Sequence, residues 1–163
     1  MDIKPIDDDI SKDNEIIEKE NELLKNEIKL LKNAIKLLKE NSIYKIKIDT
    51  LLPKDLSVKK GNSTDEFITI DEGGIQYGPY LHYEQGKYLI IYNGENLLNA
   101  KFDVFDNGLQ KFFPITIINK SQTKVIYEVI ISRNLKAGIE FWAQNNQNTL
   151  ILIKSIEVYK YNI

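Results

Sequence analysis

The sequence of 163 residues contains no cysteine and a single histidine, His82. The lack of cysteine excludes disulfide bonds, cysteine-ligated zinc and thiol catalysis. One histidine excludes a histidine-rich metal site within one chain, although such a site on an oligomer axis stays open. With 22 basic and 24 acidic residues, the formal net charge is only -2. This near balance predicts neither nucleic acid nor an anionic membrane as a partner.

Long apolar runs are also missing. No stretch approaches the roughly 18 consecutive apolar residues that a membrane-spanning helix requires, so no membrane span is predicted. The N-terminal residues are acidic, contain Pro5 and lack the apolar region of a secretory signal. We therefore expect a soluble protein that is cytoplasmic by default.

Glycine and proline are absent from residues 10–41, where Leu, Ile, Lys, Glu and Asn predominate. Residues 43–163, by contrast, contain every glycine, all prolines but one and the only tryptophan. The change in composition predicts a disordered N-terminus over 1–9, a coiled-coil oligomerisation helix over 10–41, and a β-sandwich domain over 43–163.

Apolar residues recur with a period of seven along the predicted helix. With Ile28 and Ile35 at heptad position a, Leu or Ile occupies every d position through the helix. A parallel seam in this register also pairs Glu20 with Lys25 and Glu27 with Lys32, from position g to position e. We therefore predict a parallel homo-oligomer. The residues expected to form its seam are Ile17, Leu24, Ile28, Leu31, Ile35 and Leu38.

The number of strands in the coiled coil depends on two opposing signals. Isoleucine at a, leucine at d, and asparagine at Asn14 and Asn21 favour a dimer. A second apolar line at position c, which includes Leu23 and Leu30, would stay in water in a dimer. A trimer is therefore favoured over a dimer. Two alternatives remain open: docking of the β domain on this line, and a single amphipathic helix packed on its own domain.

From Ile43 onwards, short β-prone runs alternate with turn residues. About eight or nine such runs occur without intervening helices. Three tight turns are predicted, at 71–74, at Asn93-Gly94 and at 106–108. The pattern indicates a mainly β fold, an antiparallel β-sandwich (jelly roll) preceded by a long N-terminal coiled-coil α-helix. We expect the first and last strands to be neighbours. The runs cover residues 43–48, 67–70, 87–92, 100–105, 112–118, 124–132, 138–143 and 150–161.

Sequence patterns of known catalytic sites are missing. There is no nucleophile elbow, phosphate-binding loop or dinucleotide fingerprint. The acidic pairs at 65–66 and 71–72 lack the spacing of a calcium loop and are interpreted as solvated. We therefore predict no catalytic residue, no metal and no cofactor. A glycosidase carboxylate pair is the enzymatic alternative that the sequence leaves open.

Two parts of the β domain resemble a known family. They are YGPYLHY (77–83) followed by GKYLIIY (86–92), and GIEFW (138–142) followed by LILIKSIEV (150–158). They are similar to carbohydrate-binding-module-like jelly-roll domains that accompany bacterial surface-polysaccharide glycosyltransferases. The resemblance implies a non-catalytic domain that binds glycans. Relatives with a structural calcium carry an Asp before the apolar pair of the last strand. Lys154-Ser155 stands there, so the resemblance implies no calcium site.

Strand alternation selects the candidate site residues. Because side chains in a strand point alternately to opposite faces, Trp142 should share a polar face with Glu140 and Gln144. Sugar rings stack on exposed aromatic rings, and their hydroxyls pair with carboxylates and amides. The alternative is a Trp142 covered by the other sheet, the stalk or another subunit. A second candidate cluster contains Tyr77, Tyr80, His82 and Tyr83.

Together these patterns predict a non-catalytic, oligomeric carbohydrate-binding or accessory module that displays β-sandwich heads on a coiled-coil stalk. The alternative is a structural or assembly protein whose β-sandwich contacts protein partners.

Overall fold

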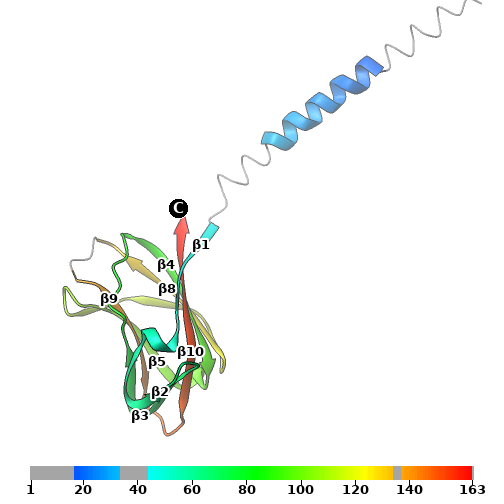
Figure 1. Ribbon diagram of the computed structural model, residues 1–163. Coiled ribbons are helices and arrows are strands. Elements are labelled where there is room, and N and C mark those ends of the chain that lie inside the picture. The colour runs from blue at the N-terminus through cyan, green and yellow to red at the C-terminus, as the bar shows by residue number, and fades with distance from the viewer. Residues whose placement is uncertain (1–16, 34–43, 134–136, 163) are drawn as a thin grey trace, which may run out of the picture. The chain divides into compact units, whose positions relative to one another are not determined.

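The computed structural model describes residues 17–33, 44–133 and 137–162. The chain divides into two compact units, Met1–Ser42 and Ile43–Ile163. In the first unit residues 17–33 form an α-helix (Figure 1), which confirms helical structure in this part of the predicted coiled coil. Within the described ranges, no helix has the length and apolarity needed to cross a membrane. The predicted disorder of 1–9 and the seam residues Ile35 and Leu38 lie outside the described residues.

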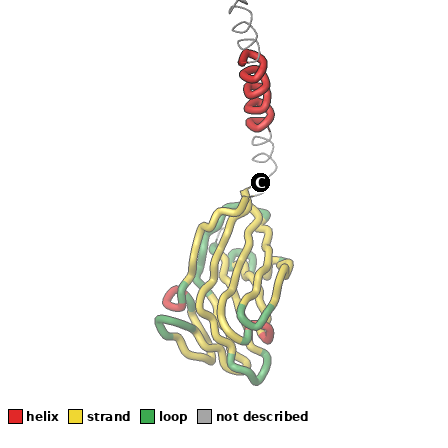
Figure 2. The backbone as a smooth tube through the Cα atoms, turned by 90° about the vertical axis from the view of Figure 1, so that its right-hand side faces the viewer, coloured by secondary structure: helices red, strands yellow, loops and turns green. Residues whose placement is uncertain are grey.

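The second unit is an antiparallel β-sandwich, which confirms the predicted mainly β, jelly-roll-like fold. Its strands run lengthwise along the unit (Figures 1 and 2). One layer has the order β6-β5-β9-β3-β2, and the other has the order β7-β8-β4-β10-β1. The strands are β1 (Tyr44–Leu51), β2 (Ser57–Ser63), β3 (Ile68–Tyr77), β4 (Gly86–Glu95), β5 (Ala100–Asp106), β6 (Lys111–Phe113), β7 (Ile115–Lys120), β8 (Lys124–Ile131), β9 (Ile139–Asn145) and β10 (Ile151–Asn162). Two short 3-10 helices, η1 (Pro53–Asp55) and η2 (Leu97–Asn99), lie in the connections.

Strand β3 joins the two layers. Its first residues, Ile68 to Ile70, pair with β10, whereas Ile75 and Gln76 pair with β9. The first and last strands of the unit are neighbours, as predicted, since Tyr44 pairs with Asn162.

The core lies between the two layers and is formed by alternate residues of their strands. Tyr92 of β4 and Phe102 of β5 meet across the core with ring centroids 4.7 Å apart. Both rings are at most 5% exposed. Full burial of a large apolar side chain contributes about 1.5–3 kcal/mol. The alternating apolar residues of the predicted runs therefore supply most of the stabilisation of this unit.

The turn predicted at Asn93-Gly94 is wrong, because both residues lie inside β4. Gly94 pairs with Ile153 where β10 bulges. A Cβ atom on Gly94 would lie 1.9 Å from the Leu152 carbonyl oxygen. Glycine is therefore required here for the close approach of two backbones rather than for a turn.

The turn predicted at 71–74 is also wrong, because these residues continue β3. Strand β2 pairs with β3 on this side, and a Cβ atom on Gly74 would lie 2.2 Å from the Lys60 carbonyl oxygen. The polar sequence of β2 carries no strand pattern, so this strand was not predicted. The predicted run 112–118 divides at Pro114, which has no backbone N–H for a sheet hydrogen bond. For these reasons the described part of the chain has ten strands, where eight or nine were expected.

Candidate functional site

Strand β9 places Trp142 on the outward face of its sheet. Ile139, Phe141 and Ala143 are fully buried in the core. The alternating residues, Trp142 among them, point to the opposite face, as the strand pattern predicted. The other sheet therefore does not cover Trp142.

Two phenylalanines surround the indole ring of Trp142. The Phe105 ring stacks on it with centroids 5.0 Å apart and an interplanar angle of 27°. The Phe112 ring meets it edge-on at 5.3 Å and 79°. Phe105 and Phe112 themselves lie 5.1 Å apart. We call Phe105, Phe112 and Trp142 the aromatic triangle.

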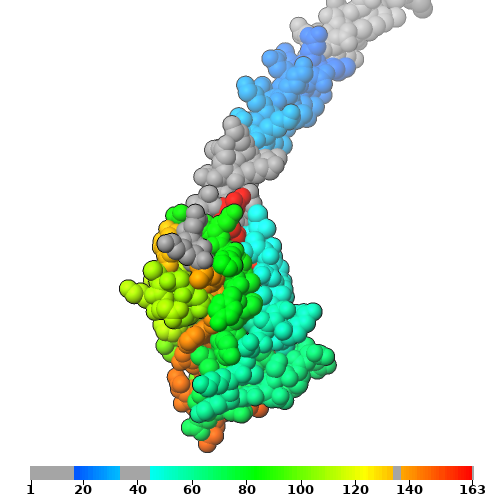
Figure 3. Space-filling model, turned by 60° about the vertical axis from the view of Figure 1, so that its left-hand side comes forward, coloured from blue at the N-terminus to red at the C-terminus, as the bar shows by residue number. Residues whose placement is uncertain are grey.

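Strand pairing brings the triangle together. Phe105 of β5 pairs with Glu140 of β9 on one side and with Phe112 of β6 on the other. Figure 3 shows this face: orange atoms of β9 lie between the yellow-green atoms of β5 and β6 and the green atoms of the segment that follows β3. The Phe112 side chain is 47% exposed, whereas Phe113 packs against the core.

Glu140 supplies a carboxylate beside the triangle. It is only 3% exposed, and the Trp142 Nε1–H donates a hydrogen bond of 2.7 Å to its Oε2. The negative charge of Glu140 raises the pKa of Tyr80. Backbone hydrogen bonds between Leu81 and Ile139 hold the segment between β3 and β4 beside Glu140.

An amide and an ion pair border the triangle on the side opposite Glu140. Gln144 of β9 pairs in register with Lys101 of β5. The Lys101 Nζ lies 2.9 Å from Asp103 Oδ2 and 5.8 Å from the centroid of the Phe112 ring. Asp103 pairs in register with Trp142. Polar groups that can exchange hydrogen bonds with hydroxyls therefore flank the aromatic surface.

The second predicted cluster divides between two places. Tyr77 ends β3 on the outward face. It contributes to the raised pKa of Tyr80. Tyr83 packs on the core side instead. Its ring stacks on Tyr88 at 5.3 Å, and its hydroxyl donates to Asp49 Oδ2 at 3.3 Å. Burial raises the pKa of Tyr83 far above the ordinary tyrosine value. His82 is exposed in the same segment.

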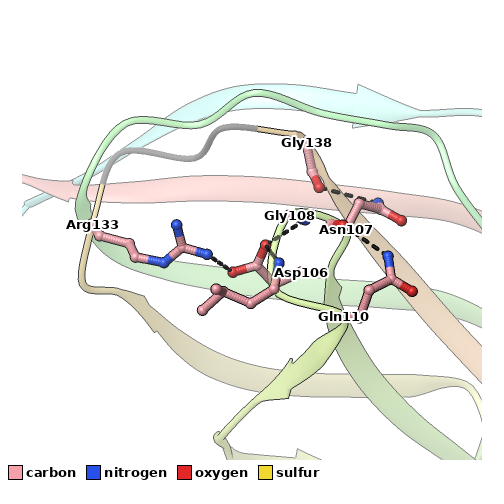
Figure 4. A network of polar contacts seen from close by, with 7 residues as sticks. Asp106, Asn107, Gly108, Gln110, Arg133 and Gly138 are labelled. Carbon is pink, nitrogen blue, oxygen red and sulfur yellow. Dashed lines mark hydrogen bonds and ion pairs between the residues drawn. The ribbon is translucent and has the colours of Figure 1, made fainter.

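The turn after β5 is held by a buried carboxylate, shown in Figure 4. Asp106 is 2% exposed, and its Oδ1 accepts hydrogen bonds from the backbone N–H groups of Gly108 and Leu109 at 2.9 and 3.2 Å. Its Oδ2 pairs with Arg133. The turn predicted at 106–108 is confirmed, and its order fixes the position of β6 and hence of Phe112.

Other parts of the described surface offer different chemistry. A polar hollow of about 630 Å³ is lined by residues 93–96, 122–124 and Lys154, and contains no aromatic ring. Within the described residues no group of three acidic or histidine side chains could hold a metal ion. The aromatic triangle is the candidate site, because it places three aromatic rings in mutual contact beside hydrogen-bonding groups.

Phe105 and Phe112 are the site residues that the sequence interpretation missed. Alternation within 100–105 could have placed Phe105 opposite the core residues Phe102 and Val104. Its contact with Trp142 could not be found in the same way, since it depends on the pairing of β5 with β9.

Comparison with known proteins shows likeness only among solved structures. No family model matches the sequence, and no curated protein matches it. A family 6 carbohydrate-binding module of Cellvibrio mixtus lichenase 5A, in complex with cellotriose, aligns with a TM-score of 0.48 and 15% identity over 72% of this chain and 100% of that one. A β-1,3-glucan-binding family 6 module from Bacillus halodurans has a TM-score of 0.45 and 7% identity over 71% and 96% of the two chains. A variant of a family 29 module, complexed with mannohexaose, aligns with a TM-score of 0.46 and 16% identity over 72% of this chain and 92% of that one.

All three alignments have TM-scores below 0.5 and identities of 16% or less, so they carry no inference about the function of this chain. The association with bacterial surface-polysaccharide glycosyltransferases stays a prediction.

Proposed function

We propose that this protein is a non-catalytic carbohydrate-binding or accessory module that displays β-sandwich heads on a self-associating helical stalk. The observation that carries the proposal is the aromatic triangle on the outward face of β5, β6 and β9. It places an indole and two phenyl rings beside a carboxylate, an amide and an ion pair.

This combination suits a sugar ring on physical grounds. The C–H face of a pyranose packs on an aromatic ring, and its equatorial hydroxyls reach polar groups at the ring's border. Gln144, Lys101 and Asp103 lie at the border of the triangle. Phe112, 47% exposed at the edge strand β6, would extend the apolar surface beyond Trp142.

Titration with glycans, followed by tryptophan fluorescence, tests the site directly because Trp142 is the only tryptophan. A glycan array first identifies a polysaccharide fragment that the protein binds. We expect this fragment to change the fluorescence emission of Trp142. Trp142→Ala should weaken binding by at least about tenfold, since one aromatic contact contributes about 1 kcal/mol beyond the area it buries. That variant is assayed by calorimetry, because it has no tryptophan signal.

The matched control is Leu98→Ala. Leu98 is an apolar residue on η2, 46% exposed, and it lies outside the triangle. It should leave glycan affinity unchanged. A folded wild-type protein that binds nothing across a broad glycan array would refute the proposed function.

The stalk is the second part of the proposal. The described helix exposes a continuous apolar surface, and water is a poor solvent for so many large side chains. Half or more of each is exposed: Ile17 53%, Leu23 63%, Leu24 54%, Ile28 51%, Leu30 69% and Leu31 62%.

A second and third copy of the same helix are the proposed cover for this surface. The charges support parallel self-association, because Glu20 and Glu27 at g would face Lys25 and Lys32 at e. Leu23 and Leu30 at c are the most exposed of the set, at 63% and 69%. A dimer would leave them in water, so we favour a trimer.

Self-association would compensate for the weak affinity of a shallow sugar site. An open sheet face binds a glycan weakly, but linked sites on one oligomer bind a repeating polysaccharide together. The gain in avidity is about 10²–10⁴ when the geometry allows simultaneous contact.

A protein-contact head on the same stalk is the second candidate function. It is favoured by the exposure of Phe112 at the edge of the sheet, where a partner surface could pack. The glycan titration separates the two, because a protein-contact head would leave Trp142 emission unchanged with every glycan.

A further inference from the structure

Glu140 has an unusual position for a residue on the outward face of a sheet. Although it alternates with the core residues Ile139 and Phe141, it is only 3% exposed. A carboxylate taken out of water needs hydrogen-bond donors, or its burial is costly. The protein itself supplies such a donor to Glu140.

This donor is the indole of Trp142. Its Nε1–H lies 2.7 Å from Glu140 Oε2, which is a short, charge-assisted hydrogen bond between residues two apart on the same strand face. Because Phe105 stacks on the indole at 5.0 Å, the ring is held both on a face and at its polar edge.

The neighbouring aromatic residue is Tyr80, which is 66% exposed. Its segment is held against β9 by two backbone hydrogen bonds between Leu81 and Ile139, of 2.9 and 2.7 Å. The negative charge of Glu140 raises the pKa of Tyr80. The carboxylate of Glu140 therefore lies where the segment of Tyr80 meets β9, and its hydrogen-bond donor is the Trp142 indole.

We propose that Glu140 is a positioning residue of the glycan-binding face: its carboxylate orients the Trp142 indole and does not itself contact the glycan. This inference rests on the proposed function and changes the role of Glu140 from a partner of sugar hydroxyls to an internal support. Holding the indole in place before the ligand arrives reduces the ordering cost of binding.

Trp142 makes the inference measurable without any ligand, because a protein with one tryptophan has one indole N–H resonance and one tryptophan emission. In the free wild-type protein the indole N–H should resonate downfield and exchange slowly with water. Glu140→Ala should move this resonance upfield, speed its exchange and lower the fluorescence anisotropy of Trp142. Glu140→Gln keeps an acceptor oxygen but loses the charge, and should give intermediate values.

Two further variants test whether the change in the indole resonance is specific to Glu140. Tyr80→Phe removes only the phenol hydroxyl, so the indole resonance should stay near its wild-type position. Gln144→Ala changes the next outward residue of β9, two positions beyond Trp142, and should leave the indole resonance near its wild-type position. Circular dichroism confirms the fold of each variant, and if Glu140→Ala does not fold, Glu140→Gln decides.

Binding supplies the final comparison. Glu140→Ala should lower affinity for the array-selected glycan about tenfold, the equivalent of one charge-assisted hydrogen bond, and Glu140→Gln by clearly less. Two outcomes overturn the inference: an unchanged indole resonance in Glu140→Ala, or equal losses of affinity in both variants with a wild-type resonance in Glu140→Gln. Failure of the wild-type protein to bind glycans would refute the proposed function but leave the indole comparison valid.

Discussion

Gly94 is a residue at which one added methyl group should be costly. Its Cβ atom would lie 1.9 Å from the Leu152 carbonyl oxygen and 3.2 Å from the Ile153 Cα. These are backbone atoms of a paired strand, which cannot relieve the steric clash by a rotamer change as a side chain can. We expect Gly94→Ala to lower the free energy of unfolding by at least about 2 kcal/mol, measured by urea denaturation.

Thr123→Ala is the control for this prediction. Gly94 N–H donates to the Thr123 carbonyl oxygen at 3.1 Å, and the control variant keeps that backbone bond. A change within about 0.5 kcal/mol is expected, as for other exposed positions. If both variants lost the same stability, the close approach at the β10 bulge would not be the cause.

At the scale of the strand, the outward face of the second layer is organised around two carboxylates. Glu128 accepts from Tyr161 and pairs with Lys87 at 2.7 Å. Each carboxylate therefore has a lysine partner on a neighbouring strand, and such cross-strand pairs stabilise a sheet. The second group has the same composition. Glu157 accepts from Tyr159 at 2.7 Å and pairs with Lys47 at 2.9 Å.

Acid should weaken this layer. Hydrogen bonds from Lys87 and Tyr161 lower the pKa of Glu128, and those from Tyr159 and Lys47 lower the pKa of Glu157, relative to the ordinary value of 4.5. A lowered folded-state pKa stabilises the protein above the unfolded value, and this contribution is lost as pH falls through the folded value. We expect the urea midpoint to decrease below about pH 4.5.

Removing both carboxyl charges should make that decrease shallower. The variant is Glu128→Gln with Glu157→Gln, and the control is Glu66→Gln with Glu72→Gln, at two exposed positions outside this face. Urea denaturation over a series of pH values compares the three proteins. An identical acid profile for the carboxyl variant and the wild type would show that these contacts do not govern acid stability.

For the whole molecule, the oligomeric state tests the stalk. Light scattering should give about three times the chain mass of 18.9 kDa. Lys25→Glu with Lys32→Glu puts like charges opposite Glu20 and Glu27, and should shift the protein towards monomer. Lys19→Glu with Lys29→Glu makes the same change of charge at f and b, outside the seam, and should leave the mass unchanged.

The outcomes distinguish the stalk from the head. A wild-type protein that stays monomeric with folded heads would refute self-association and leave the sugar site untouched. Equal dissociation by the two double variants would show that net charge, rather than pairing between g and e, sets the mass.

Particular strands show which features can be read from the sequence. β9 and β10 were predicted because their residues alternate between core and surface, and the pattern also placed Trp142 on the correct face. β2 was missed because its seven residues, SVKKGNS, are nearly all exposed and polar. Gly94 was assigned to a turn. The sequence alone cannot distinguish a glycine in a turn from a glycine that is needed because the backbone of a paired strand lies close to it.

Local periodicity was enough to establish the helix around residues 17–33, the mainly β character of the rest, and the direction in which Trp142 points, because each depends on residues close together in the chain. The neighbours of Trp142 depend on tertiary structure. Phe105 and Phe112 reach it through the pairing of three strands, and Tyr80 reaches Glu140 through the bridge between Leu81 and Ile139. Such contacts join residues 30 or more positions apart, as from Phe112 to Trp142. Their register is set by how the two layers pack around one core, which no short segment encodes.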